Sequence, residues 1–107
     1  MSDITAKDLK ARLDAGESLN MIDVREPHEW DMQHLPGVQK ISLGLIPQKL
    51  AELEDLKDKE VILICRSGNR SGRATEFLKN NGFSNPRNLA GGMLNWRVEI
   101  DPDFQVQ

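Results

Sequence analysis

The chain has 107 residues, of which 38% are hydrophobic and 29% are charged, and its formal net charge at pH 7 is −3. This size and composition are typical of a single soluble globular domain, expected here over residues 1–107. A small acidic excess without a stripe of Lys and Arg argues against nucleic-acid binding. The longest apolar run, residues 61–65, is too short to cross a bilayer. A lone cysteine and the lack of a secretory signal in residues 1–10 favour a reducing cytoplasm.

Patterns typical of strands alternate along the chain with patterns typical of helices. Capping signals, periodic apolar residues and breaks at glycine or proline define their boundaries. Helices are expected in residues 5–16, 27–32, 45–56, 72–78 and 91–96, and strands in residues 19–24, 38–42, 61–64 and 87–89. This alternation predicts a doubly wound α/β domain with a mainly parallel sheet. Residues 99–107 continue neither pattern and are expected to form a loosely ordered tail.

The stretch with the most chemical information begins at the only cysteine. Cys65 ends residues 61–64, an uninterrupted apolar strand that is expected to be buried on both faces. Three arginines and no acid lie in residues 61–73, just before and within the next expected helix. Gly68 can adopt a positive φ, so successive backbone N–H groups can form a concave anion nest around the sulfur. A thiol in this setting is expected to exist largely as the nucleophilic thiolate.

Three separated motifs resemble those of one known family. Residues 65–71, Cys-Arg-Ser-Gly-Asn-Arg-Ser, resemble the active-site loop of the rhodanese-like sulfurtransferases. The amino-terminal signature of that family is similar to residues 23–25, 29–30 and 34–37, and the carboxy-terminal one to residues 89–92 with Trp96. Gln33 and Val38 differ from the glycine and alanine that the family often has there. The resemblance covers nearly the whole chain and implies a rhodanese-like fold, with a five-stranded sheet and helices on both faces.

The resemblance also implies a thiosulfate sulfurtransferase. In that activity the Cys65 thiolate takes the outer sulfur of thiosulfate or a similar anionic donor and holds it as a persulfide. Cyanide, or a small thiol or thioredoxin-like acceptor, then removes the sulfur. The implied substrate-binding loop comprises Arg66, Ser67, Gly68, Asn69, Arg70 and Ser71. Its amides would stabilise the anionic intermediate, while Arg66 and Arg70 would hold the donor.

The remaining polar groups have supporting roles or none. Asp23 and Arg25 are expected to form an ion pair that braces the loop edge rather than to act in catalysis. His28 and His34 lie in turn-rich segments, where histidines are commonly just solvated. No cluster of cysteine and histidine has the spacing of a metal site, so neither a metal nor an organic cofactor is expected.

Three alternatives stay open at this stage. A lone cysteine that ends a buried strand is often an inert small hydrophobe, although the basic loop argues against this here. A phosphatase or arsenate reductase also brackets an anion loop with cysteine and arginine, but such loops are generally one residue longer than residues 66–69. A non-catalytic persulfide carrier or regulatory module would have the same motif as an enzyme. The physiological donor, the acceptor and the oligomeric state leave no pattern in the sequence.

Overall fold

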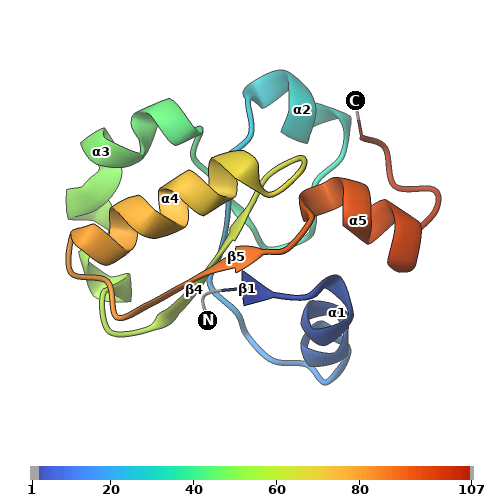
Figure 1. The fold of residues 1–107 in the computed structure, drawn as a ribbon, viewed down its shortest axis with the longest axis horizontal. Helices are drawn as coiled ribbons and strands as arrows, with labels where there is room; N and C mark the ends of the chain where they lie inside the picture. Colours follow the sequence, from blue (N-terminus) through green and yellow to red (C-terminus); the bar gives the residue numbers. More distant parts are fainter. Residues whose placement is uncertain (1–2, 107) are drawn as a thin grey trace.

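The computed structural model describes residues 3–106 and contains one five-stranded sheet with helices packed on both faces (Figure 1). The strands lie in the order β1-β5-β4-β2-β3, and all neighbouring strands are parallel. The strands are β1 Asp3–Ile4, β2 Met21–Asp23, β3 Gln39–Lys40, β4 Glu60–Ile64 and β5 Asn85–Leu89. The α-helices are α1 Ala6–Asp14, α2 Pro27–Met32, α3 Ile46–Lys49, α4 Asn69–Asn80 and α5 Gly92–Glu99. The doubly wound α/β architecture expected from the sequence is confirmed.

Strand β4 lies inside the sheet and divides the hydrophobic core into two parts. Ile62 and Ile64 pack with residues of α1 and α5 on one face. Val61, Leu63 and Cys65 point to the other face, where α3 and α4 cover the sheet. Because both faces of the strand are buried, the sequence shows a continuous apolar run instead of alternation. The Cys65 side chain therefore faces the layer that contains α4.

The strand boundaries differ from those expected: β2 and β3 are shorter than the predicted ranges 19–24 and 38–42, and β4 begins one residue earlier, at Glu60. Strand β1 was not located from the sequence, because two residues cannot display a periodic pattern. Strand β5 begins at Asn85 rather than at Arg87 and so includes Pro86. Strand β1 pairs with β5 only at Asn88 and Leu89. Pro86 has no backbone N–H to donate, but β1 does not extend to its position, so no hydrogen bond to β1 is lost there.

The helix expected over residues 45–56 is wrong as a single α-helix. A short 3₁₀ turn, Leu43–Leu45, leads into the four residues of α3, and a second 3₁₀ segment, Leu50–Leu56, follows. Three leucines of that second segment pack against the core: Leu50, Leu53 and Leu56. Their spacing of three residues matches the 3₁₀ helix, which has three residues per turn, so all three face the sheet.

The expectation of a loosely ordered tail over residues 99–107 is also wrong for the part that the structure describes, since Glu99 is the last residue of α5. Phe104 has only 3% of its surface exposed and belongs to the core on the α1 and α5 side. Ile100 and Val106 pack against the same core. The backbone N–H of Gln105 donates to Oε1 of Gln33 at 2.8 Å, which ties the segment to the residue after α2. Within residues 3–106, none of the helices has the length and apolar character needed to span a membrane.

Candidate active site

The candidate site lies where the carboxyl ends of parallel strands meet. Strand β2 ends at Asp23, and Cys65 follows the last residue of β4. These strands are neighbours, and the chain proceeds outward in opposite directions from them, to β3 on one side and to β5 on the other. In open α/β sheets, such a switch point leaves a crevice outside the strand ends, where ligands usually bind.

The loop after β4 is shorter than the sequence indicated, because α4 begins at Asn69 and not at Gly72. Arg66 and Ser67 form the exposed part of the turn, and Gly68 is the N-cap of the helix with φ +97°. A positive φ strains any residue with a side chain, so glycine suits this position. Asn69, Arg70 and Ser71 consequently belong to the first turn of α4, where backbone N–H groups lack intrahelical partners.

The N-terminal end of α5 holds this loop from the other side. The backbone N–H groups of Met93 and Leu94 donate to the carbonyl oxygens of Cys65 and Arg66, both at 2.9 Å. A Cβ atom on Gly92 would lie 2.5 Å from both of these carbonyl oxygens, so only glycine allows the approach. Gly92, the second glycine of the Gly-Gly pair noted in the sequence, therefore lets the N-terminus of α5 pack against the start of the Cys65 loop.

The sulfur of Cys65 is enclosed by its own loop and the first turn of α4. The residue is fully buried, and its Sγ accepts a hydrogen bond from the Gly68 N–H at 3.0 Å. The hydroxyl of Ser71, also fully buried, lies 3.2 Å from Sγ. Amide and hydroxyl donors at a helix N-terminus favour negative charge on the group that they contact. This arrangement suits a sulfur nucleophile or an anionic sulfur intermediate.

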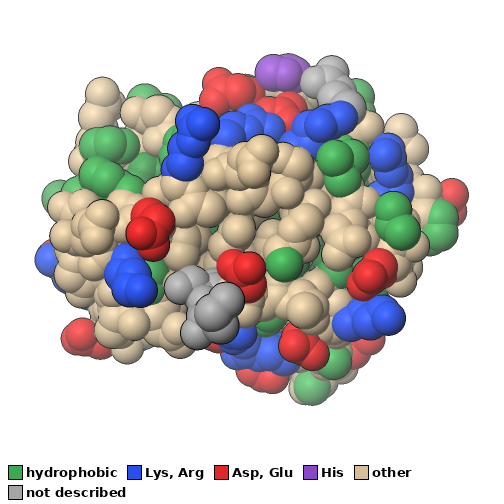
Figure 2. Space-filling view, in the orientation of Figure 1, with side chains coloured by type: hydrophobic (Ala, Val, Ile, Leu, Met, Phe, Trp, Pro, Cys, Tyr) green, Lys and Arg blue, Asp and Glu red, His purple; other side chains and the backbone are tan. Residues whose placement is uncertain are grey.

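Arg70 has a partner that the sequence reasoning did not assign. Its Nη1 and Nη2 donate to Oε1 and Oε2 of Glu29 in α2, at 2.6 and 2.9 Å. The hydrogen bonds from Arg70 lower the pKa of Glu29 to about 2, while the same contact raises the pKa of Arg70. In Figure 2, basic and acidic side chains are interspersed along the edge where α2 approaches the start of α4. The cationic loop is thus partly neutralised.

Asp23 and Arg25 form the expected ion pair at the end of β2, where Asp23 is paired in the sheet with Ile64, the residue before Cys65. Nη2 of Arg25 lies 2.9 Å from Oδ2 of Asp23, and each side chain is only 1% exposed. The same guanidinium donates to the backbone oxygen of Gln33 at 2.8 Å, which holds the end of α2. A buried pair that satisfies its hydrogen bonds in this way fixes the geometry of the backbone after β2.

Two further polar residues at the site had no assigned role. Glu29 appeared only within a family signature, and its arginine partner is 41 positions away in the sequence. Asn88, in β5, contacts both the loop and Ser71. A single polar residue in a short strand gives no sequence signal of this role. Within residues 3–106, no three side chains of His, Cys, Asp or Glu are grouped so that they could hold a metal ion.

The protein is thus a parallel α/β domain with a cysteine loop between its central strand and a helix N-terminus. Residues 5–99 match the model of the rhodanese-like domain family, and the chain belongs to that family. A solved structure of a rhodanese-like domain protein from Staphylococcus aureus superimposes with a TM-score of 0.84 at 29% identity. That match covers 100% of this chain and 99% of the other.

Two curated relatives show the range of proteins that contain a similar domain. The chain is 39% identical over 102 residues to the putative sulfurtransferase YtwF of Bacillus subtilis, covering 95% of this chain and 96% of that protein. It is 40% identical over 105 residues to the probable adenylyltransferase/sulfurtransferase MoeZ of Mycobacterium tuberculosis. The second match covers 96% of this chain but only 26% of MoeZ, so the chain spans about a quarter of that relative.

Proposed function

We propose that the protein is a sulfurtransferase that carries sulfur as a persulfide on Cys65. The observation that supports this proposal most is the position of Sγ, which accepts the Gly68 N–H and contacts the Ser71 hydroxyl at the start of α4. The names of the relatives YtwF and MoeZ, both of which include sulfurtransferase, agree with it.

The proposed reaction has two displacement steps at sulfur. The Cys65 thiolate attacks the outer sulfur of thiosulfate, a new S–S bond forms, and the old S–S bond breaks as sulfite leaves with the electron pair. The protein then holds a persulfide whose terminal sulfur carries the negative charge. Cyanide, or a small thiol or thioredoxin-like acceptor, attacks that terminal sulfur and releases the Cys65 thiolate. Donors at the helix N-terminus stabilise the anionic states.

The loop residues divide into two proposed roles. Gly68 and Ser71 contact the sulfur directly, whereas the exposed Arg66, Ser67 and Asn69 lie where an incoming donor would approach. Glu29 partly offsets the positive charge of Arg70. Arg70 therefore attracts an anionic donor less strongly than an arginine without an acidic partner would. Asp23 and Arg25 act through the backbone that they fix. We propose no metal or organic cofactor, and we place the protein in a reducing compartment such as the cytoplasm, where its lone thiol would stay reduced.

A turnover assay with three kinds of substrate tests this proposal. Thiosulfate with cyanide should give steady production of thiocyanate, and the Cys65→Ser variant should give none, because the chain has no second cysteine. Arsenate reduction and hydrolysis of phenyl phosphate should be absent. Loading from thiosulfate without turnover would instead identify a persulfide carrier, and phosphatase or arsenate reductase activity without sulfur loading would overturn the sulfurtransferase assignment.

A further inference from the structure

Asn88 connects the two groups that surround the Cys65 sulfur. It is paired in the sheet with Leu63, whose side chain faces the α4 layer, so Asn88 projects toward the same layer. Its Nδ2 donates to the carbonyl oxygen of Gly68 at 3.2 Å, and its Oδ1 accepts a hydrogen bond from the Ser71 hydroxyl. Gly68 and Ser71 are also the two residues whose donors contact Sγ. One side chain in β5 thus contacts both parts of the sulfur environment.

The Ser71 hydroxyl has one proton but two acceptors within reach. A serine hydroxyl donates a single hydrogen bond, and here both Oδ1 of Asn88 and Sγ of Cys65 lie within bonding distance. The Asn88 amide cannot rotate by 180° to relieve this competition, because its Oδ1 would then face the carbonyl oxygen of Gly68 without a proton between them. The fixed amide therefore presents an acceptor to Ser71, and the hydroxyl must choose between Asn88 and the sulfur.

We propose that Asn88 is a positioning residue that competes with the Cys65 sulfur for the proton of the Ser71 hydroxyl. In the thiol form, Ser71 donates to Asn88, and its lone pair is available to the S–H group. When the thiol proton leaves to solvent, the hydroxyl turns to the thiolate, and Asn88 Oδ1 loses its donor. Asn88 thus opposes charge on Sγ and tunes the reactivity of the thiol. This inference rests on the proposed role of Cys65 as the sulfur nucleophile.

The competition also depends on the state of the sulfur in the proposed reaction. After the thiolate has attacked the donor and sulfite has left, Sγ is a neutral bridging atom, and the charge lies on the terminal sulfur. A neutral Sγ is a poor acceptor, so the Ser71 proton can return to Asn88. Asn88 therefore destabilises the thiolate relative to the persulfide and favours the loaded protein. The hydroxyl only rotates in this cycle, and no proton passes between Ser71 and Cys65.

A double-mutant cycle tests the proposal by following the rate of iodoacetamide alkylation against pH. The four proteins are the parent, Asn88→Ala, Ser71→Ala and the double variant. With Ser71 present, Asn88→Ala should lower the pH midpoint of alkylation by about half to one unit, the size expected from one hydrogen bond. In the Ser71→Ala background the same change should leave the midpoint where it is. Asn88→Val, which suits a strand, replaces Asn88→Ala if that variant does not fold.

The charged groups on the loop and on the neighbouring elements are the same in all four proteins. They are Arg66, Arg70 with its partner Glu29, and the Asp23–Arg25 pair. Equal shifts in both Ser71 backgrounds would show that Asn88 acts only through the shape of the loop, and an upward shift or no shift with Ser71 present would also overturn the proposal. Alkylation needs no sulfur donor, so a failure of sulfur transfer in the parent would count against the proposed function and leave this measurement interpretable.

Discussion

The ion pair between Arg70 and Glu29 sets the charge that a donor meets near the Cys65 sulfur. Both oxygens of Glu29 accept from the guanidinium, and the Glu29 side chain is only 8% exposed. With a pKa of about 2, caused mainly by the hydrogen bonds from Arg70, Glu29 stays ionised at neutral pH. The pair orients Arg70 but removes much of its attraction for a doubly charged anion such as thiosulfate.

Glu29→Gln should therefore strengthen the use of thiosulfate. Removing the negative charge should lower KM for thiosulfate by about threefold to tenfold at low ionic strength, and salt should diminish this difference. The free energy of unfolding should fall by about 1–3 kcal/mol, because the charged hydrogen bonds to Arg70 are weakened. Initial rates at two salt concentrations and urea denaturation measure the two effects.

Glu52→Gln is a matched control for Glu29→Gln, because it removes an exposed acid of the second 3₁₀ segment. It should change neither the kinetics nor the stability measurably. If Glu29→Gln left KM unchanged or raised it at low salt, Glu29 would act mainly by orienting Arg70 and not by offsetting its charge.

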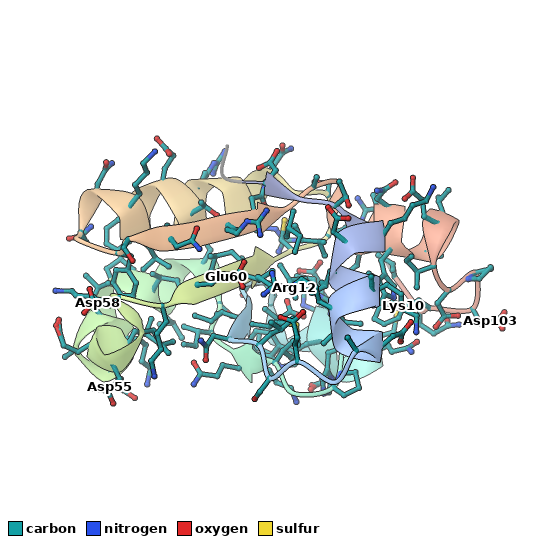
Figure 3. The ribbon with its side chains drawn as sticks, turned by 90° about the horizontal axis from the view of Figure 1, so that it is seen from below. Lys10, Arg12, Asp55, Asp58, Glu60 and Asp103 are labelled. Carbon is teal, nitrogen blue, oxygen red and sulfur yellow. The ribbon has the colours of Figure 1, made fainter. Side chains whose placement is uncertain are left out.

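A second ionic network lies at the amino end of β4, the end away from Cys65, and joins α1, β4 and β5. Arg12 of α1 donates to Glu60 of β4 through Nη1 and Nη2, at 2.8 and 2.6 Å, and Figure 3 shows the two labelled side chains next to each other between α1 and β4. Arg87 of β5 donates to the same carboxylate at 2.9 Å. The hydrogen bonds from Arg12, followed by that from Arg87, help to lower the pKa of Glu60 to about 2.

This network should make stability depend on pH in the acid range. The folded pKa of Glu60 lies below its unfolded value of about 4.3, so its contribution is complete above that pH and is lost as pH falls toward 2. Glu60→Gln should lower the free energy of unfolding by about 1–3 kcal/mol at pH 7, and the difference from the parent should disappear near pH 2. Urea denaturation at several pH values measures both.

Asp14→Asn is the comparison for Glu60→Gln, because Asp14 forms an i,i+4 pair with Lys10 and its side chain is 60% exposed. Such a pair contributes little, so this variant should follow the parent at every pH. A constant difference between Glu60→Gln and the parent from pH 7 to pH 2 would show that the carboxylate charge is not what stabilises the junction.

The elements around Cys65 were predictable from the sequence, but the contacts between them were not. Strand β4 was predicted within one residue because burial on both faces leaves an apolar run. The turn after Cys65 was predicted because its glycine and arginines lie within a few residues of one another, although Asn69, Arg70 and Ser71 belong to α4 and not to the loop. The contacts of Glu29 and Asn88 could not be predicted, because each depends on how α2 and β5 approach α4 in space. Local patterns define elements and contiguous loops, whereas contacts across elements need the packed structure.

The C-terminal segment, residues 100–106, packs into the core of the molecule. Phe104 packs with residues of α1, α5 and the sheet, although the sequence around it has no helical or strand period. A single aromatic residue among polar ones gives no signal that distinguishes a docked segment from a mobile one. The buried aromatic ring accounts for the difference from the predicted loose tail.

Phe104→Ala should lower the free energy of unfolding by about 3 kcal/mol, because it removes a buried aromatic side chain and leaves a cavity. Chemical denaturation measures the change, and Val98→Ala, at a residue that is 76% exposed, is the control. Sulfur loading per folded molecule should stay at the parental level, since Phe104 has no contact with the Cys65 loop among the described hydrogen bonds and core clusters. A loss below about 0.5 kcal/mol, the usual range of a surface substitution, would show that the segment is not docked in solution.

Mass spectrometry of the intact protein shows whether Cys65 carries transferable sulfur. After brief exposure to thiosulfate and removal of the excess, the protein should gain the mass of one sulfur atom, located on the peptide that contains Cys65. Cyanide should remove that mass, and Cys65→Ser should never acquire it. A parent protein that remains unmodified, or a Cys65→Ser variant that gains the same cyanide-labile sulfur, would show that Cys65 is not the sulfur carrier.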